Sequence, residues 1–118
     1  MDRITLTIGL LIAILLVHLA EEIKTGFRKK FPPGEIPKPL FIAGNAIVYT
    51  FCFATLFLSG RGSELGIRFA WIFAVAMLAN GAAHIGMMAL RSEYFPGGLT
   101  AFLLLSVSAY LIMQLMGR

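Results

Sequence analysis

Four long apolar segments, separated by shorter polar connections, make up most of this chain and constrain how it can fold. At a rise of about 1.5 Å per residue, an apolar helix of about 20 residues crosses the hydrocarbon core of a membrane. The predicted helices cover residues 4–23, 40–59, 67–90 and 99–116. Because short connections place neighbouring helices antiparallel, the sequence predicts an all-α, integral membrane four-helix bundle. The whole chain, residues 1–118, is expected to form a single transmembrane domain.

The composition supports a membrane as the solvent of this chain. Of the 118 residues, 58% are hydrophobic and 14% are charged, whereas soluble domains carry about 25% charged residues. A small soluble fold has too little interior to bury so much apolar surface. The single cysteine, Cys52, lies in an apolar run, so we expect a packed thiol and no intrachain disulfide. The lipid bilayer is therefore the first partner that the sequence predicts.

The net charge of +4 comes from a basic connection, residues 24–39, and does not indicate a nucleic-acid partner. Five of the ten basic residues lie in this connection: Lys24, Arg28, Lys29, Lys30 and Lys38. Its four prolines argue against a continued helix, so we predict a surface loop in which Phe27 and Phe31 lie against lipid headgroups. This side of the membrane carries six basic residues and the other side four, so the positive-inside rule predicts that loop 24–39 is cytoplasmic.

Three polar side chains are predicted to lie at one depth below the membrane face that carries loop 24–39. His18 and His84 precede the charged ends of their helices by six or seven residues, and Asn45 follows the start of the intervening helix by a similar number. At about 1.5 Å per residue, all three lie about 9 to 11 Å inside that face. Three helices are therefore expected to bring polar groups to one level of the bundle.

Two carboxylates and an amide share helix faces with these histidines. Glu21 and Glu22 follow His18 by three and four residues, and Asn80 precedes His84 by four. Residues three and four apart lie on one face of a helix. Ionisable residues inside a membrane are costly, and they almost always face the bundle interior and mark functional sites. The sequence therefore predicts a polar site shared by the first and third helices.

Three short motifs resemble those of a known family. They are His18-Leu19-Ala20-Glu21-Glu22, Asn80-Gly81-Ala82-Ala83-His84 and Tyr94-Phe95-Pro96-Gly97. In this order, together with four apolar spans, they resemble the HXXEE family of small bacterial and archaeal membrane proteins over nearly the whole chain. The resemblance implies a protein of a prokaryotic cell membrane. The family has no established activity, so the resemblance supports a site and not a reaction.

His18, Glu21, Glu22 and His84 form a candidate set of metal ligands and catalytic groups. Two imidazoles with one or two carboxylates suit zinc or iron, and an open coordination position would allow catalysis. Of the two carboxylates, we expect Glu22 to be the inner group and Glu21 to orient a histidine or to pair with the loop. The pattern is not the H-E-x-x-H zinc signature, so two other interpretations stay open. The same residues could work without a metal as general acids and bases, or they could be hydrogen-bonded and ion-paired structural residues.

Three further polar residues are candidate contacts of the ligands or of a substrate. Asn80 is expected either to hydrogen-bond His84 or to join two helices. For Asn45 we expect a hydrogen bond to a neighbouring helix in preference to a ligand role. Tyr94 either lies in an interfacial turn or covers the site, where it would hydrogen-bond a substrate or a metal-bound water.

The leading hypothesis is a small membrane-embedded, metal-dependent and hydrolase-like enzyme that acts on a lipid or other hydrophobic substrate. One alternative is a metal-free acid–base enzyme of isomerase type. Another is an oligomeric transporter of protons or metal ions, and a third is a structural or partner-binding subunit. A stripe of small residues would allow close association in a homo-oligomer: Gly81, Ala82, Ala83 and Gly86.

Overall fold

The computed structural model describes residues 2–118, and every regular element in this range is a helix. Five helices follow one another: α1 (Arg3–Thr25), α2 (Phe27–Lys30), α3 (Lys38–Gly60), α4 (Glu64–Arg91) and α5 (Gly98–Met116). All except α2 are long and apolar enough to cross a membrane. The predicted all-α bundle with four candidate membrane spans is therefore confirmed.

The helix ends differ from the predicted ones, most clearly at the connection 24–39. Helix α1 continues to Thr25, and α2 occupies four residues that were expected to be loop. Proline excludes helix only near its own position, and the first proline of this connection is Pro32. Gly26 separates the two helices, because its φ of 78° lies in the left-handed region that glycine adopts without strain. The loop proper therefore begins only after α2.

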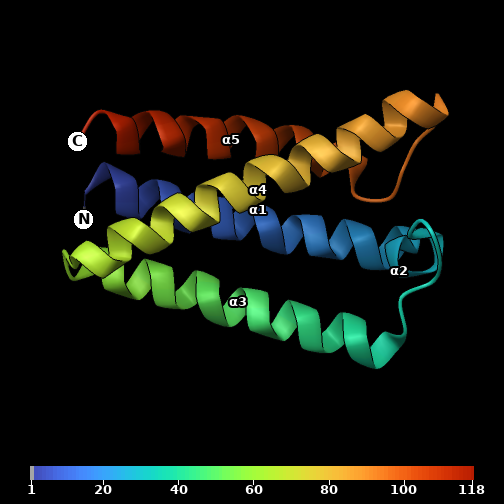
Figure 1. Cartoon of the computed structure of the whole chain (residues 1–118), viewed down its shortest axis with the longest axis horizontal. Helices are drawn as coiled ribbons and strands as arrows, with labels where there is room; N and C mark the ends of the chain where they lie inside the picture. Colours follow the sequence, from blue (N-terminus) through green and yellow to red (C-terminus); the bar gives the residue numbers. More distant parts are fainter. Residues whose placement is uncertain (1) are drawn as a thin grey trace.

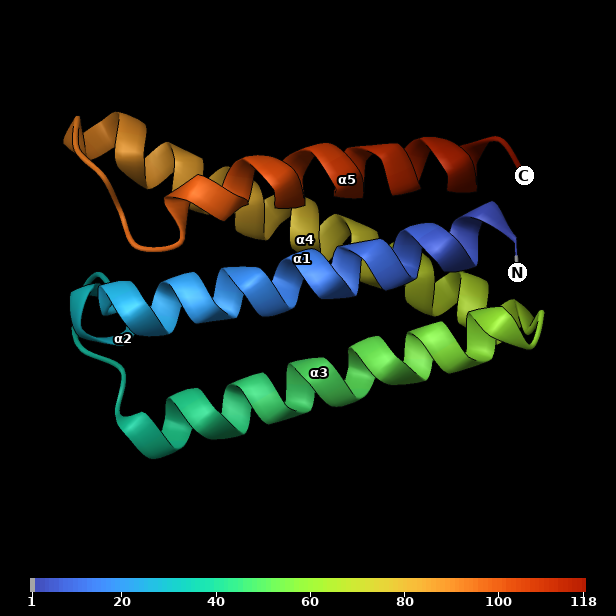
Figure 2. The ribbon, with the colours of Figure 1, turned by 180° about the vertical axis from the view of Figure 1, so that it is seen from behind.

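The four long helices alternate in direction (Figure 1). Helix α1 lies between α3 and α5, while α4 crosses obliquely and packs against both α5 and α3. Figure 2 shows the same order from behind. Both chain ends and the α3–α4 turn lie at one end of the bundle, and the α1–α3 and α4–α5 connections lie at the other. This alternation brings the charged end of α1 next to the end of α4 and the start of α5.

The bundle has an apolar interior and an apolar surface. Large side chains fill its centre: Ile8, Leu11, Phe73, Leu104 and Leu111 are fully buried. Gly81 allows α4 to approach α5, because a Cβ at this position would lie 2.9 Å from the carbonyl oxygen of Ala101. The outward faces carry many exposed leucine, isoleucine and phenylalanine side chains, especially on α3, as expected for helices surrounded by lipid. One member of the small-residue stripe, Gly81, is thus used for packing within the chain.

Candidate metal centre

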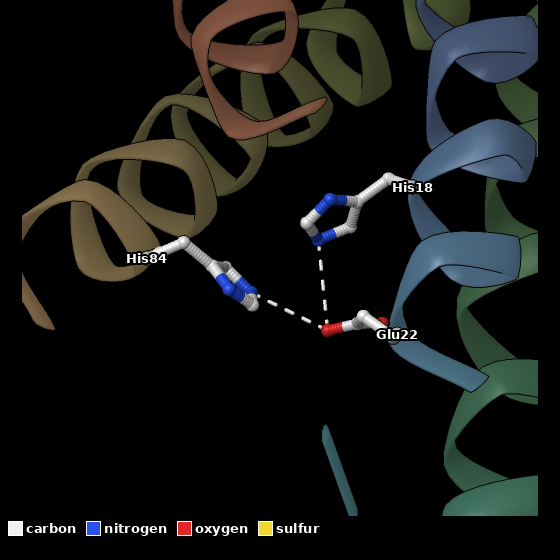
Figure 3. Close-up of side chains that lie close together, drawn as sticks. All are labelled: His18, Glu22 and His84. Atoms are coloured by element: carbon white, nitrogen blue, oxygen red, sulfur yellow. Dashed lines mark ion pairs between the residues drawn. The ribbon is translucent and has the colours of Figure 1, made fainter. Parts of the chain in front are cut away.

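Side chains from α1 and α4 meet near the end of the bundle that carries α2. His18, Glu22 and His84 place one donor atom each within 4.8 Å of the others. The Oε2 atom of Glu22 lies 3.5 Å from Nε2 of His18 and 3.3 Å from Nε2 of His84, and Figure 3 shows both rings directed at this oxygen. Both histidines are buried, while 11% of the Glu22 side chain is exposed. The helix positions His18 and Glu22 on one face because they are four residues apart.

The α4–α5 connection fixes which nitrogen of His84 carries hydrogen. Nδ1 of His84 lies 2.8 Å from the carbonyl oxygen of Pro96. A carbonyl oxygen can only accept a hydrogen bond, so Nδ1 is the donor. In the neutral imidazole, Nε2 then carries a lone pair and no hydrogen. This lone pair faces Glu22.

A chain of hydrogen bonds assigns the same arrangement to His18. Nδ1 of His18 lies 2.7 Å from Oγ1 of Thr100, and this hydroxyl donates its own hydrogen to Oε1 of Glu21 at 2.6 Å. With its hydrogen used on a carboxylate, the hydroxyl accepts the Nδ1–H of His18. Nε2 of neutral His18 is therefore a lone-pair acceptor as well. It is buried, and it has no hydrogen-bond partner among residues 2–118.

Glu21 has a different role from Glu22, although the two are adjacent in the sequence. Its carboxylate accepts the backbone N–H groups of Leu99 and Thr100, at 3.0 and 2.9 Å, and the hydroxyl of Tyr94. Together with the Thr100 hydroxyl, these four donors match the four lone-pair positions of a carboxylate. The start of α5 has no capping side chain of its own, and Glu21 supplies the acceptor from α1. Tyr94 thus holds Glu21, and burial together with this bond raises the pKa of Tyr94.

Gly97 leaves the space that the two imidazoles occupy. A Cβ at this position would lie 2.6 Å from Cε1 of His84 and 2.8 Å from Cε1 of His18, closer than such atoms approach. The φ of Gly97 is 89°, which also favours glycine. The Tyr94-Phe95-Pro96-Gly97 motif therefore contributes three features to the site. The Tyr94 hydroxyl bonds Glu21, the Pro96 carbonyl oxygen accepts from His84, and Gly97 leaves room for both imidazoles.

Aromatic rings cover the site from the side of α2. The ring of Phe27 lies 5.2 Å from that of His84 and 5.8 Å from that of Phe95, which is itself buried. We expected Phe27 to lie against headgroups with Phe31, but Phe27 packs inward on the histidine, and the basic residues of α2 follow it. Phe27 is the first residue of α2 and directly follows Gly26, where the chain leaves α1.

The two asparagines do not hydrogen-bond the histidines. Asn45 donates from Nδ2 to the carbonyl oxygen of Phe41 in its own helix, and not to a neighbouring helix as expected. Asn80 shares a face with His84, yet Nδ1 of His84 is already bonded to Pro96, and Asn80 only approaches the sulfur of Met77 at 4.0 Å. Both asparagines instead line an apolar groove that reaches the site.

The separations of the three donor atoms are compatible with a bound cation. Two imidazole nitrogens and a carboxylate oxygen point at one another, and acceptors held this close repel unless a proton or a metal ion lies between them. Ligands about 2.0 to 2.1 Å from a tetrahedral zinc ion lie about 3.3 Å apart. The two separations that involve Glu22, 3.3 and 3.5 Å, match this value. The fixed Nδ1–H groups resemble the outer hydrogen bonds that orient histidine ligands of metals.

Comparison with known proteins gives a family and no activity. Neither the curated proteins nor the solved structures that were compared with the chain contain a match. A family model described as a protein of unknown function with an HXXEE motif matches residues 9–111. This range includes all three donor residues and the groups that orient them. The chain is therefore a member of the HXXEE family.

Proposed function

We propose that His18, Glu22 and His84 bind a divalent zinc or iron ion and that the protein is a membrane-embedded, hydrolase-like enzyme. The observation that carries this proposal is the buried Nε2 atom of His18, which lacks a hydrogen-bond partner within residues 2–118 and faces two other acceptors. A hydrogen-bonded structural role would leave this atom unsatisfied, at a cost of about 1–3 kcal/mol. A bound metal ion would satisfy all three donor atoms at once.

The ligand set supports hydrolysis as the reaction class. Two histidines and one glutamate form the protein ligands of several catalytic zinc sites, in which a fourth position stays open for water or substrate. A metal ion bound in this way polarises an ester, amide or phosphoryl oxygen and lowers the pKa of a bound water toward 7. The chain contributes the orientation of both lone pairs, through Pro96 and Thr100. Phe27 and Phe95 limit the access of water from one side.

A hydrophobic substrate is supported by the surroundings of the site. Glu22 and His84 line a groove of about 520 Å³ whose other lining residues are mostly apolar. The groove opens at the surface of helices that are apolar enough to be surrounded by lipid. A molecule dissolved in the bilayer would therefore reach the donor atoms without crossing water.

Elemental analysis of the purified protein in a neutral detergent tests the proposal. We expect about one zinc or iron ion per chain in the wild type, and loss of the metal in His18→Ala, His84→Ala and Glu22→Gln. Glu93→Gln is the matched control, because Glu93 is exposed and lies outside the site. Circular dichroism checks that each variant keeps its helices. A wild type that stays metal-free after incubation with both ions would refute the metal and favour acid–base chemistry by the same residues.

A further inference from the structure

Two hollows of different character meet at Glu22. The first is a basic cleft of about 650 Å³ at the end of α1, and the second is the apolar groove of about 520 Å³ described above. Glu22 and Phe41 line both of them. One molecule with a polar end and an apolar end could therefore occupy both hollows, with the junction of its two ends beside the candidate metal centre.

The basic cleft carries positive charge that the protein does not neutralise. Four basic side chains line it: Lys24, Arg28, Lys29 and Lys38. Arg28 is paired with Glu35 at 2.9 Å, whereas the three lysines form no ion pair with any residue in the range 2–118. Within residues 2–118, Glu22 is the only carboxylate that lines the cleft, and its single negative charge is smaller than the summed charge of the three lysines. The cleft is therefore complementary to an anionic group.

The apolar groove provides room for a hydrocarbon chain. Leu40, Phe41, Gly44 and Val48 line it on α3, and Phe31 lines it near α2. Figure 1 shows that α3 and α4 are close at their shared turn and diverge toward this end of the bundle. A Cβ at Gly44 would meet no atom within 4 Å, so this wall of the groove is open. Lipid chains could enter between the two helices from the bilayer.

We propose that the site binds a lipid with an anionic phosphate headgroup. Only the reaction that follows binding rests on the proposed function. The phosphate lies in the basic cleft near Lys24, Lys29 and Lys38. The hydrocarbon chain lies in the groove along α3. The bond between headgroup and chain is then next to Glu22 and the candidate metal ion.

Binding of dioleoyl phosphatidic acid to the whole 118-residue chain tests this inference. The protein is titrated in a neutral detergent, and the bound lipid is counted by native mass spectrometry. Dioleoyl phosphatidylcholine has the same chains with a zwitterionic headgroup, and glycerol phosphate has the anionic group without chains. We expect the protein to prefer phosphatidic acid over both. Equal binding of the two lipids would refute the role of the cleft, and competition by glycerol phosphate at equal concentration would refute the role of the groove.

Two pairs of matched variants locate the lipid. Lys29→Gln is expected to weaken the binding of phosphatidic acid about fivefold, as about 1 kcal/mol per basic residue at a membrane surface implies. Lys30→Gln changes the neighbouring lysine, which does not line the cleft, and is expected to change binding less than twofold. Gly44→Leu fills the groove and should weaken binding by a factor similar to that of Lys29→Gln, whereas Gly86→Leu places the same side chain outside it. Equal effects within either pair would overturn the assignment.

The metal content of the same samples separates the two proposals. Lys29→Gln and Gly44→Leu should bind the lipid more weakly and keep the metal content of the wild type. A metal-free wild type that still prefers phosphatidic acid would refute the metal centre and leave the lipid site intact. A metal-containing wild type without lipid preference would refute the lipid site alone.

Discussion

Replacing Thr100 with valine tests the hydrogen-bond chain that orients His18. The Thr100 hydroxyl lies 2.7 Å from Nδ1 of His18 and 2.6 Å from Oε1 of Glu21. Valine has nearly the same shape but cannot hydrogen-bond, so Nδ1–H of His18 loses its acceptor in a buried position. An unsatisfied buried group of this kind costs about 1–3 kcal/mol. Glu21 keeps its other three donors, so the start of α5 should stay capped.

The larger effect of Thr100→Val is expected on metal affinity. Without its acceptor, His18 is free to rotate or to carry its hydrogen on Nε2, where it would block the metal ion. Loss of such an outer hydrogen bond lowers metal affinity about 10- to 100-fold. The dissociation constant is measured in neutral detergent by competition with a zinc-binding dye. Thr100→Ser keeps the hydroxyl and should bind zinc nearly as tightly as the wild type.

Two results would refute this reasoning about Thr100. Wild-type zinc affinity in Thr100→Val would mean that the hydroxyl does not orient His18. Equal weakening in the serine and valine variants would mean that the methyl group, and not the hydroxyl, is what the site needs. Thermal unfolding of both variants shows whether either result reflects a general loss of structure.

Three further predictions concern Gly97, Glu21 and the removal of the metal ion. Gly97→Ala should destabilise the protein by about 2–4 kcal/mol, because an alanine would have to adopt a left-handed backbone conformation and its Cβ would push the imidazoles apart. The control Gly34→Ala places its Cβ in open space and should leave the melting temperature unchanged. Glu21→Gln should speed hydrogen exchange of the first amides of α5, since the amide side chain offers fewer acceptors than the carboxylate, whereas Glu93→Gln should not. Removal of a metal present at about 100 times its dissociation constant should lower the free energy of unfolding of the wild type by about 2.7 kcal/mol. The chelator that removes the metal should leave the free energy of unfolding of Glu22→Gln unchanged. An unchanged free energy of unfolding in the chelator-treated wild type would contradict the prediction.

The helices and the depth of the histidines could be predicted because both follow from distances along the chain. Apolar length determines a membrane span, and a fixed rise per residue places His18 and His84 near one face. The spacing of three and four residues likewise puts Glu21 and Glu22 next to His18. It does not determine which carboxylate faces α4 and which faces α5, since that depends on how the helices pack.

Thr100 was missed because nothing in its immediate sequence marks it. Its role depends on the approach of α5 to α1, which brings together residues about eighty positions apart. One signal was present: α5 begins at Gly98, directly after Pro96 and Gly97, and none of these three residues can cap a helix with its side chain. The first amides of that helix needed an acceptor from elsewhere. The nearby carboxylates of α1 were the available candidates, and Thr100 is among the residues whose amides they could reach.

Helix α2 was missed for a related reason. Its four residues are too few to show a helical pattern, and the prolines that follow made the whole connection look irregular. Phe27 therefore appeared to be one more interfacial aromatic residue. Only the tertiary fold, which brings the end of α4 close to α2, shows that this ring rests on His84.

The cap that Glu21 provides to α5 also bears on how the protein is assembled. During synthesis α1 enters the membrane before α5. Glu21 and His18 therefore lack their hydrogen-bond partners on α5 until this last span is inserted. Only then do the Thr100 hydroxyl and the amides of α5 reach them, and only then can the lone pair of His18 be held toward Glu22. A chain cut short before residue 98 would contain His18, Glu22, His84 and the Pro96 carbonyl oxygen that orients His84, but it would lack the Thr100 hydroxyl that orients His18. If the proposed metal ion binds, its affinity should therefore depend on the arrival of α5.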